Sequence, residues 1–266
     1  KGVAGAVGVL SRIAREAAFP AANFRDYATV LQTDEVPVKF HVRAAPTAYE
    51  VTSSGSTVLV TGPGSTTTSV DAKTWKAEAE WDLEYAEDLP FPELAVSTME
   101  IGNACAVQEA QAGVNALHGI ADASLAATEL TTAVSDTAIM EMRRDILIKN
   151  RAPSFVEFDA ANERQVYTNA NIKDRTIFGE ILDIRRGAIG DFMGVSFYRS
   201  QLNKSASANS GQPMMGDGRF IVLVVRRDLT LTPYETKGSR GIWGSIRSNA
   251  GVLENTAFHR CAAWTS

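Results

Sequence analysis

The chain has 266 residues and a mass of 28.6 kDa, enough for one large domain or two modest ones. Hydrophobic residues make up 45% of it and charged residues 21%, so the sequence can build the core of an ordinary globular protein. The formal net charge is -5 and the pI is about 5.4, which argues against a module that grips nucleic acid through a basic surface.

The sequence indicates neither a disulfide framework nor a membrane segment. Its two cysteines, Cys105 and Cys261, are far apart and lack metal-site spacing, so we expect two buried free thiols. No stretch reaches the roughly 18 apolar residues that a membrane-spanning helix needs. No cleavage signature follows the short apolar run at residues 1–10, and we expect the chain to be made in the cytosol.

The N-terminal part predicts a short helix followed by an extended arm. Residues 7–19 place apolar side chains on one helical side and polar ones opposite, and Pro20 ends this pattern. Residues 21–36 mix polar and apolar side chains without a period. Such a segment favours an extended arm over a packed element.

A strand and a long loop are predicted next. Residues 36–51 indicate extended structure because Val38, Phe40 and Val42 alternate with charged or polar neighbours. Residues 53–69 are rich in Ser, Thr and Gly and predict a loop or the tip of a long hairpin. This segment lacks the Gly-Lys pattern of a phosphate-binding loop.

Residues 75–85 carry the clearest local pattern in the chain. The odd positions are apolar or aromatic throughout. The even positions hold Lys76, Glu78, Glu80, Asp82 and Glu84. Strict alternation over this length predicts a strand with one apolar face and one charged face. The charged face meets either solvent or a basic partner surface, and the sequence leaves both open.

Two helices are expected after this strand. Residues 92–117 are rich in alanine, contain no internal proline, and carry larger apolar residues at helical spacing. They predict one long helix whose small side chains allow neighbours to approach closely. Residues 135–149 predict a second helix, capped by Ser135 or Asp136.

The C-terminal half reads as short strands separated by loops. We predict a strand at 154–158, short strands punctuated by glycine in 176–200, and a flexible loop at 201–218. The six apolar residues 220–225 predict a strand buried on both faces, which continues from 229 until Pro233. A last strand is expected at 256–264. The absence of a βαβ rhythm makes the fold class α+β.

Residue patterns typical of enzymes are missing. His41, His118 and His259 are far apart and none has a second ligand at metal-site spacing, so each is expected to be a structural or surface histidine. There is no nucleophile elbow and no dinucleotide fingerprint. Acidic residues cluster in 78–88. Such a cluster is more often the charged face of a strand than the catalytic carboxylate pair of a glycoside hydrolase. We predict no catalytic residue, no cofactor and no metal.

The order of the expected elements resembles that of the major capsid proteins of tailed phages, which have the Hong Kong 97-type fold. In that family an N-terminal arm leads into a two-stranded extension, the E-loop. A charged strand and an acidic turn then enter the long spine helix of a peripheral domain. The corresponding segments here are KTWKAEAEWDLEYAEDLPF and PELAVSTMEIGNACAVQEAQAGVNAL. The segments GEILDIRRGAIGDFMGVSFYRS and GRFIVLVVRRDLTLTPYE look like the axial domain and a late buried strand.

The resemblance implies a division of the chain into five parts. They are an N-terminal arm at 1–36, an E-loop with flanking strands at 37–85, a peripheral domain with the spine helix at 86–153, a mainly axial domain at 154–218, and return strands shared by both domains at 219–266. It also implies a structural protein whose pentamers and hexamers form an icosahedral shell around the dsDNA of a phage. Such shells assemble in the host cytoplasm, with portal, scaffold and decoration proteins as further partners.

One departure from some relatives concerns covalent crosslinking, which joins an E-loop lysine to a neighbouring subunit. Residues 52–69 contain no lysine, so we expect a noncovalent shell.

Charge is distributed unevenly, and this suggests contacts between copies. Residues 71–100 hold nine acids against two bases, whereas residues 219–266 hold seven bases against three acids. We therefore expect acidic strands of one subunit to meet basic patches of the next, with Trp75 and Trp81 either as anchors of such contacts or packed into their own domain. The candidate contact residues are Trp75, Glu78, Glu80, Trp81, Glu84, Glu87, Asp88, Arg185, Arg186, Arg226 and Arg227.

Two alternatives stay open at this point. An encapsulin, a bacterial nanocompartment shell of the same fold, would load a cargo enzyme, and its neighbouring genes would distinguish it from a virus. A soluble hydrolase with an unrecognised site would elute as a monomer.

Overall fold

The computed structural model describes residues 24–35, 37–43, 65–82, 84, 93–159, 162–164, 166, 188–192, 194–203 and 211–262. The helix expected at 7–19 lies outside these residues, as does the expected hairpin tip up to residue 64.

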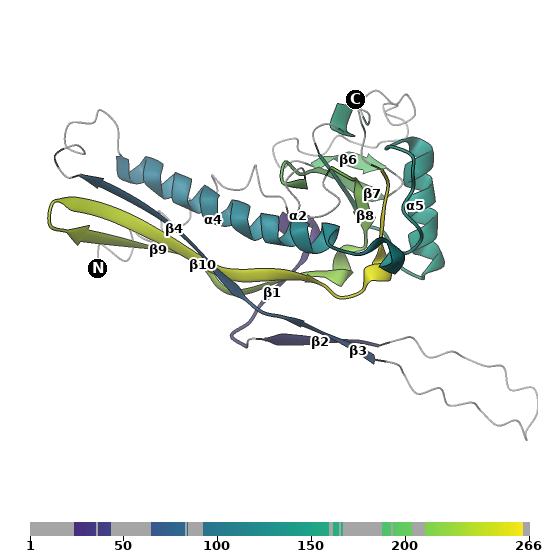
Figure 1. Ribbon diagram of the computed structural model, residues 1–266, viewed down its shortest axis with the longest axis horizontal. Helices are drawn as coiled ribbons and strands as arrows, with labels where there is room; N and C mark the ends of the chain where they lie inside the picture. Colours follow the sequence, from purple (N-terminus) through teal and green to yellow (C-terminus); the bar gives the residue numbers. More distant parts are fainter. Residues whose placement is uncertain are drawn as a thin grey trace, which may run out of the picture.

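A four-stranded sheet forms the elongated half of the molecule (Figure 1). Its two long strands, β9 (Ile221–Thr236) and β10 (Ser239–Val252), are an antiparallel hairpin. Strand β4 (Lys73–Asp82) pairs antiparallel with β10 over its whole length, and β1 (Thr29–Gln32) pairs parallel with the start of β9. We call β4, β9 and β10 the ribbon, and the end at the β9–β10 turn its free end.

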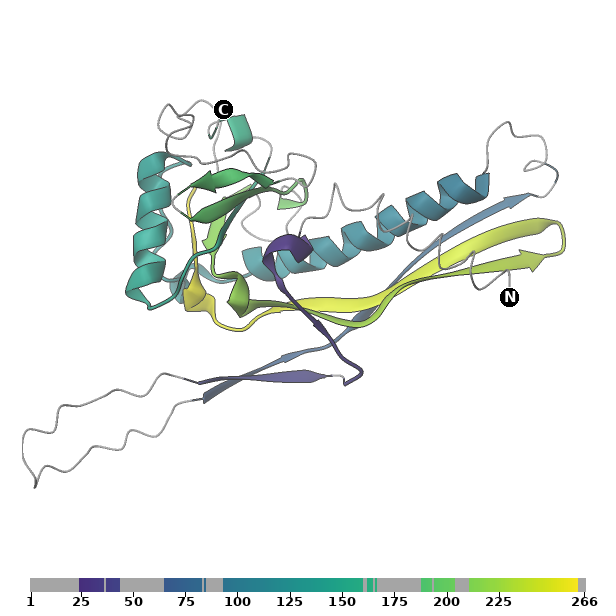
Figure 2. The same ribbon diagram turned by 180° about the vertical axis from the view of Figure 1, so that it is seen from behind.

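Helix α4 (Glu93–His118) lies along one face of the ribbon (Figures 1 and 2). Toward the free end, Ile101 and Cys105 pack against apolar side chains of β9 and β10. The helix approaches closely because β10 has a glycine here: a Cβ at Gly244 would lie 2.4 Å from a methyl group of Ile101. This packing confirms the expected long helix and explains its small residues.

The segment expected to be an extended arm is packed as a helical turn at residues 24–27, so that prediction was wrong there; β1, which follows, is extended and its side chains are exposed. Helix α2 (Phe24–Tyr27) is a single turn whose Phe24 and Tyr27 are buried. The Phe24 ring occupies the space above Gly113 of α4, where a Cβ would lie 2.4 Å from the ring. Two aromatic side chains three residues apart bury enough apolar surface to fix this turn, and β1 follows it directly.

A five-stranded sheet forms the compact half. Its strands, in spatial order, are β11 (Phe258–Arg260), β8 (Met214–Gly216), β5 (Phe155–Phe158), β7 (Val195–Arg199) and β6 (Ala188–Phe192). Three short 3-10 turns lie on the connections between the two halves. They are η2 (Asp122–Ser124), η5 (Gly218–Phe220) and η6 (Asn255–Ala257).

Helix α5 (Asp136–Ile148) covers one face of this second sheet. Ser135 caps it as expected, its side chain accepting a hydrogen bond from the Ala138 N–H at 3.1 Å. Ile139, Met142 and Ile146 pack against β5, β7 and β8. Since α5 belongs to the compact half, the boundary expected at residue 153 falls inside this unit.

A two-stranded hairpin projects from the body (Figures 1 and 2). Strand β2 (Val38–Arg43) pairs antiparallel with β3 (Ser65–Val70), with Arg43 opposite Ser65. Val38 and Phe40 pack with Val70 over two valines of β9. The base of the expected hairpin is thus confirmed.

Three expectations in the C-terminal half need correction. The loop predicted at 201–218 contains β8, whose Met214 and Met215 are fully buried in the second sheet. Strand β9 does not stop at Pro233 but continues to Thr236. Among the described residues, β1 pairs only with residues 222–225 of β9, so β9 is an edge strand at Pro233. Proline is tolerated in an edge strand. Strand β10 was not anticipated at all, because glycine and serine interrupt its apolar pattern.

The two halves meet at the C-terminal end of α4. The guanidinium of Arg260, fully buried, donates to the carbonyl oxygens of His118 and Ile120 at 3.4 and 2.7 Å and to the carboxylate of Asp122. A cation that binds the last carbonyls of a helix also complements its dipole. Beside it, the buried His118 and Glu157 side chains lie 3.1 Å apart.

A second buried histidine lies between β11 and α5. Nε2 of His259 is 3.5 Å from the Asp145 carboxylate. Burial, the largest effect, lowers the pKa of His259 below its ordinary 6.5, and the Asp145 carboxylate opposes this shift.

Phe24→Ala should destabilise the protein by about 3–5 kcal/mol, because it empties the space over Gly113. The matched control is Met99→Ala on the exposed side of α4, which should cost less than about 0.5 kcal/mol. Urea unfolding followed by circular dichroism measures both. Equal costs for the two variants would show that α2 is not part of the core.

Arg260→Met should cost about 2 kcal/mol or more, since it removes charge-assisted hydrogen bonds from buried carbonyls. Arg240→Met is the control: Arg240 and its partner Glu235 are both more than half exposed, and the loss should stay below about 1 kcal/mol. A similar loss in both variants, measured by thermal unfolding, contradicts the capping role.

The stability of the fold should decrease on acidification in a way that depends on His259. Its lowered pKa means that the unfolded chain binds a proton first, so stability present above pH 6.5 is lost as the pH falls from there through the folded pKa. In His259→Gln the difference in unfolding free energy between pH 7.5 and pH 5 should shrink. An unchanged difference would refute the assignment.

Candidate assembly surfaces

The ribbon is covered by α4 on one face only. Trp75, Ala77, Ala79 and Trp81 of β4 point toward α4, and the alternate residues of β4 are exposed on the opposite face, which we call the outer face. This arrangement confirms the predicted alternation. It also places the charged residues of β4 together on a surface that α4 leaves uncovered.

Trp75 and Trp81 pack within their own chain. Both are half-buried against the cluster of Ile101, Leu229 and Ile242. The sequence left open whether these rings anchor contacts between copies or pack into their own domain, and the structure places them in the chain's own core. Their exposed edges stay candidates for contact with another copy.

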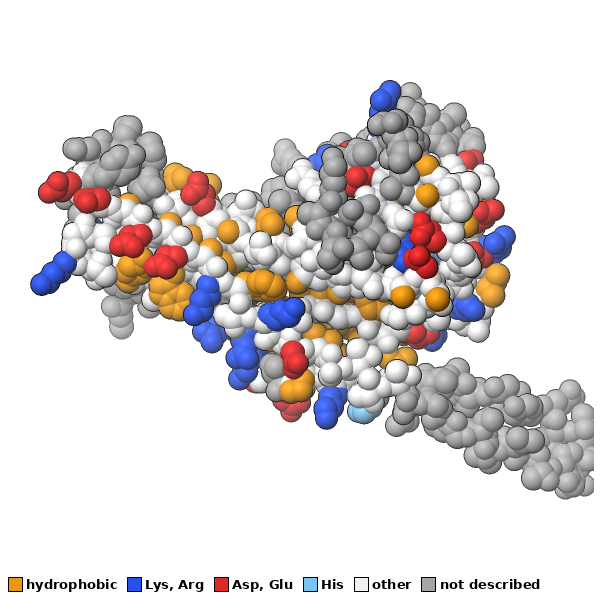
Figure 3. All heavy atoms as spheres, in the orientation of Figure 1, with side chains coloured by type: hydrophobic (Ala, Val, Ile, Leu, Met, Phe, Trp, Pro, Cys, Tyr) orange, Lys and Arg blue, Asp and Glu red, His pale blue; other side chains and the backbone are white. Residues whose placement is uncertain are grey.

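The acidic residues of β4 lie toward the free end of the ribbon (Figure 3). Glu78 accepts a hydrogen bond from the Tyr234 hydroxyl, and Glu80 accepts one from the hydroxyl of Ser239. Tyr234 crosses β10 because Gly241 leaves room: a Cβ there would lie 2.4 Å from the ring. Its hydrogen bond to Glu78, followed by burial, raises the pKa of Tyr234 to about 12.

Arginines of β9 and β10 lie near the middle of the ribbon, where Figure 3 shows a group of Lys and Arg side chains, whereas Arg240 of β10 lies near the free end. Arg226 and Arg227 are exposed, and Arg227 is paired in register with Arg247 of β10. Lys76 of β4 lies between this basic band and the acidic end, with its ammonium 5.7 Å from the centre of the Trp243 ring.

The remaining candidate residues are not assembled into one surface by the structure. Glu84 is described and exposed. Glu87, Asp88, Arg185 and Arg186 lie outside the described residues. Sequence reasoning missed Tyr234, Trp243 and Arg247, because β10 was not recognised as the central strand that brings β4 and β9 together.

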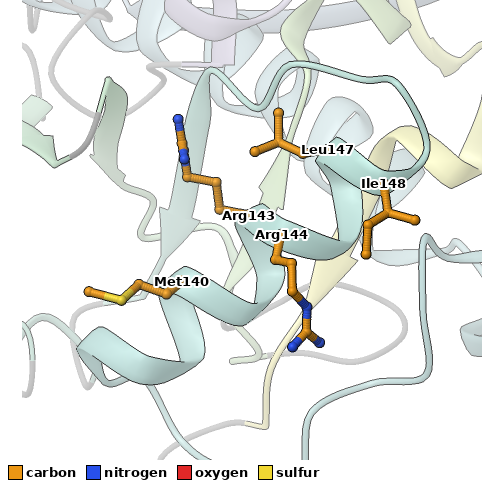
Figure 4. Close-up of a pocket in the computed structure, with 5 residues that line it drawn as sticks. All are labelled: Met140, Arg143, Arg144, Leu147 and Ile148. Carbon is orange, nitrogen blue, oxygen red and sulfur yellow. The ribbon is translucent and has the colours of Figure 1, made fainter.

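Helix α5 carries a second exposed surface. Met140, Leu147 and Ile148 are 43%, 42% and 67% exposed, and Arg143 and Arg144 lie between them. Figure 4 shows these five side chains around a shallow hollow on the helix. Their spacing of three, four, seven and eight residues defines one stripe, opposite the stripe that packs on the sheet.

Within the described residues, no three His, Cys, Asp or Glu side chains converge as metal ligands would. Both cysteines are buried free thiols, as expected; burial raises the pKa of Cys105 and raises that of Cys261 to about 12, so neither is a thiolate near neutral pH. No helix that the structure describes has the length and apolar character to span a bilayer.

Comparison with known proteins finds no matching family model and no matching curated sequence. Solved structures do match. The capsid structure of the cyanophage P-SCSP1u aligns with a TM-score of 0.71 at 16% identity, over 93% of this chain and 89% of that chain. The capsid of a native GTA particle aligns with a TM-score of 0.68 at 13% identity, over 92% and 91%. A structure from Mycobacterium phage Che8 gives 0.67 at 14%, over 90% of each chain.

These alignments span almost the whole chain at an identity too low to carry more than architecture. They match the elements described above: a long helix on a ribbon, a compact α+β unit and a projecting hairpin. The fold of this chain is therefore the Hong Kong 97-type fold seen in phage capsid structures.

Proposed function

We propose that this chain is the major capsid protein of a tailed phage, a structural subunit whose copies form an icosahedral shell of pentamers and hexamers around dsDNA. The observation that carries the proposal is near-complete structural alignment with phage capsid subunits. The projecting β2–β3 hairpin and the ribbon with α4 on one face support it, because the described residues leave much of their surface uncovered and available to other copies.

The parts of the fold take the roles that the resemblance implies. The β2–β3 hairpin is the base of the E-loop, and α4 with the ribbon is the peripheral domain. The second sheet with α5 is the axial domain, so this domain starts earlier than residue 154. The shell would be a virion component assembled in the host cytoplasm, with portal, scaffold and decoration proteins as candidate partners.

An encapsulin shell of the same fold is the second candidate, since the fold alone is common to both. The neighbouring genes separate them: portal and terminase genes favour the phage, and a cargo-enzyme gene favours the nanocompartment. For the hydrolase alternative, the described residues offer no metal-ligand cluster, and both cysteines are buried; elution of the purified chain as a monomer would favour it.

The purified full chain should form hollow particles of uniform size, seen by negative-stain microscopy and as a fast species in sedimentation velocity. Replacing residues 44–64 by Asn-Gly joins Arg43 to Ser65, which already face each other across the hairpin, through a two-residue turn. This variant should keep its melting temperature and lose particle formation. A wild-type chain that stays monomeric under all assembly conditions would contradict the proposed function.

A further inference from the structure

Two arginines of like charge face each other on the outer face of the ribbon. Arg227 of β9 and Arg247 of β10 are partners in the strand register, and Arg247 is also opposite Thr74 of β4. Side chains directly opposite each other on a sheet are about 5 Å apart at Cβ, and like charges there are destabilising. Within the described residues neither arginine has an ion-pair partner.

The backbone around this pair is irregular. The register of β9 and β10 shifts on both sides of Arg247, which marks a bulge. Bulges re-aim side chains and are frequent at functional positions. Arg247 is half-buried, and its buried Nε has no hydrogen-bond partner in the described part of the chain. A guanidinium held in this way lacks hydrogen-bond acceptors for part of its N–H groups until an anion binds it.

A matching group of anions lies on the same face of the same ribbon. Glu78, Glu80 and Asp82 are exposed at every second position of β4, and the donors to Glu78 and Glu80 are uncharged hydroxyls. Glu78 and Glu80 follow Thr74 by four and six residues, which correspond to about 13 and about 20 Å along a strand. These carboxylates are therefore too far from the arginine pair to neutralise it within one copy.

We propose that the Arg227–Arg247 pair is the receiving site for carboxylates of the acidic β4 end, Glu78 and Glu80, of a second copy of this chain. The contact is head-to-tail, with the free end of one ribbon against the middle of the next. Heterologous contacts of this kind generate rings when the rotation between neighbouring copies closes, and open filaments when it does not. The inference rests on the proposed function, in which rings are the capsomers.

A nucleic acid is a poorer occupant than a second copy. The carboxylates that share the outer face with the arginines would repel a phosphate backbone laid along the ribbon. The chain as a whole is also acidic, with a net charge of -5. In the head-to-tail contact, the acidic β4 end of the second copy reaches only the arginine pair. The acidic ends of the two copies are then not placed side by side.

The first test is Arg247→Glu in the full chain. It converts the like-charge pair into an opposite-charge pair with Arg227 inside one copy, so the melting temperature of the dispersed chain should stay the same or rise. The concentration needed for particle formation should rise at least about tenfold, because the receiving site now repels the acidic end. Arg247→Lys, which keeps the charge, is the control and should assemble.

The decisive test is a charge exchange. Arg227→Glu with Arg247→Glu should block particle formation, and so should Glu78→Arg with Glu80→Arg. The chain that carries all four substitutions should assemble again, as measured by light scattering and microscopy. Failure of the fourfold variant to assemble, although its dispersed form melts like the wild type, overturns the inference.

Two further outcomes keep this inference separate from the proposed function. If wild-type chains form no particles, the proposed function fails first. If Arg247→Glu assembles like the wild type, only the inference fails; a loss of affinity for a duplex DNA oligonucleotide in that same variant would assign the arginine pair to nucleic acid instead.

Discussion

The close packing of α4 on one face of a three-stranded ribbon determines the shape of this molecule. The helix can lie against the sheet because Gly244 of β10 admits Ile101, and α2 packs on the helix because Gly113 admits Phe24. A 26-residue helix over strands of 10 to 16 residues makes a long, thin body. Such a body has much surface for its volume. Among the described residues, α4 covers one face of the ribbon, and the β2–β3 hairpin covers the other face only near Val222 and Val224. The rest of the described outer face is left for other molecules.

The same helix also joins the elongated half to the compact half. At its C-terminal end, the carbonyl oxygens of His118 and Ile120 accept hydrogen bonds from the buried guanidinium of Arg260. The side chain of His118, its last residue, lies against Glu157 of the second sheet. Polar groups buried at this depth are costly unless each finds a partner, so the junction tolerates few alternative arrangements. The halves are also joined by one apolar cluster, in which Leu223 of β9 packs together with Phe155 of β5 and Met214 of β8. The hydrogen bonds add a directional constraint to this packing. A shell subunit needs a fixed arrangement of its two halves, because every copy must present its surfaces in the same relative positions.

Sequence patterns predicted best what depends on local periodicity. Strict alternation marked β4, alanine-rich helical spacing marked α4, and a capping serine with a buried stripe marked α5. They failed where tertiary contacts decide the structure. Nothing local distinguishes β10, whose glycines matter only because Ile101 and Tyr234 fill the space above them. For the same reason the in-register partnership of Arg227 with Arg247 was invisible, although Arg227 itself was a candidate. The arm prediction failed at residues 24–27 because their partners are distant in sequence: Phe24 packs over Gly113 of α4, and Tyr27 stacks on Phe155 of β5.

The central claim is that this fold buries the α4 face of the ribbon within the chain, whereas the charged outer face of β4 is buried only between copies. Hydrogen–deuterium exchange, compared between dispersed chains and purified particles, tests it most directly. The account predicts that amides of α4 are equally protected in both forms, whereas amides of β2, β3 and the outer edge of β4 gain protection on assembly. Equal exchange of these strands in both forms, or protection gained chiefly along α4, would contradict the account.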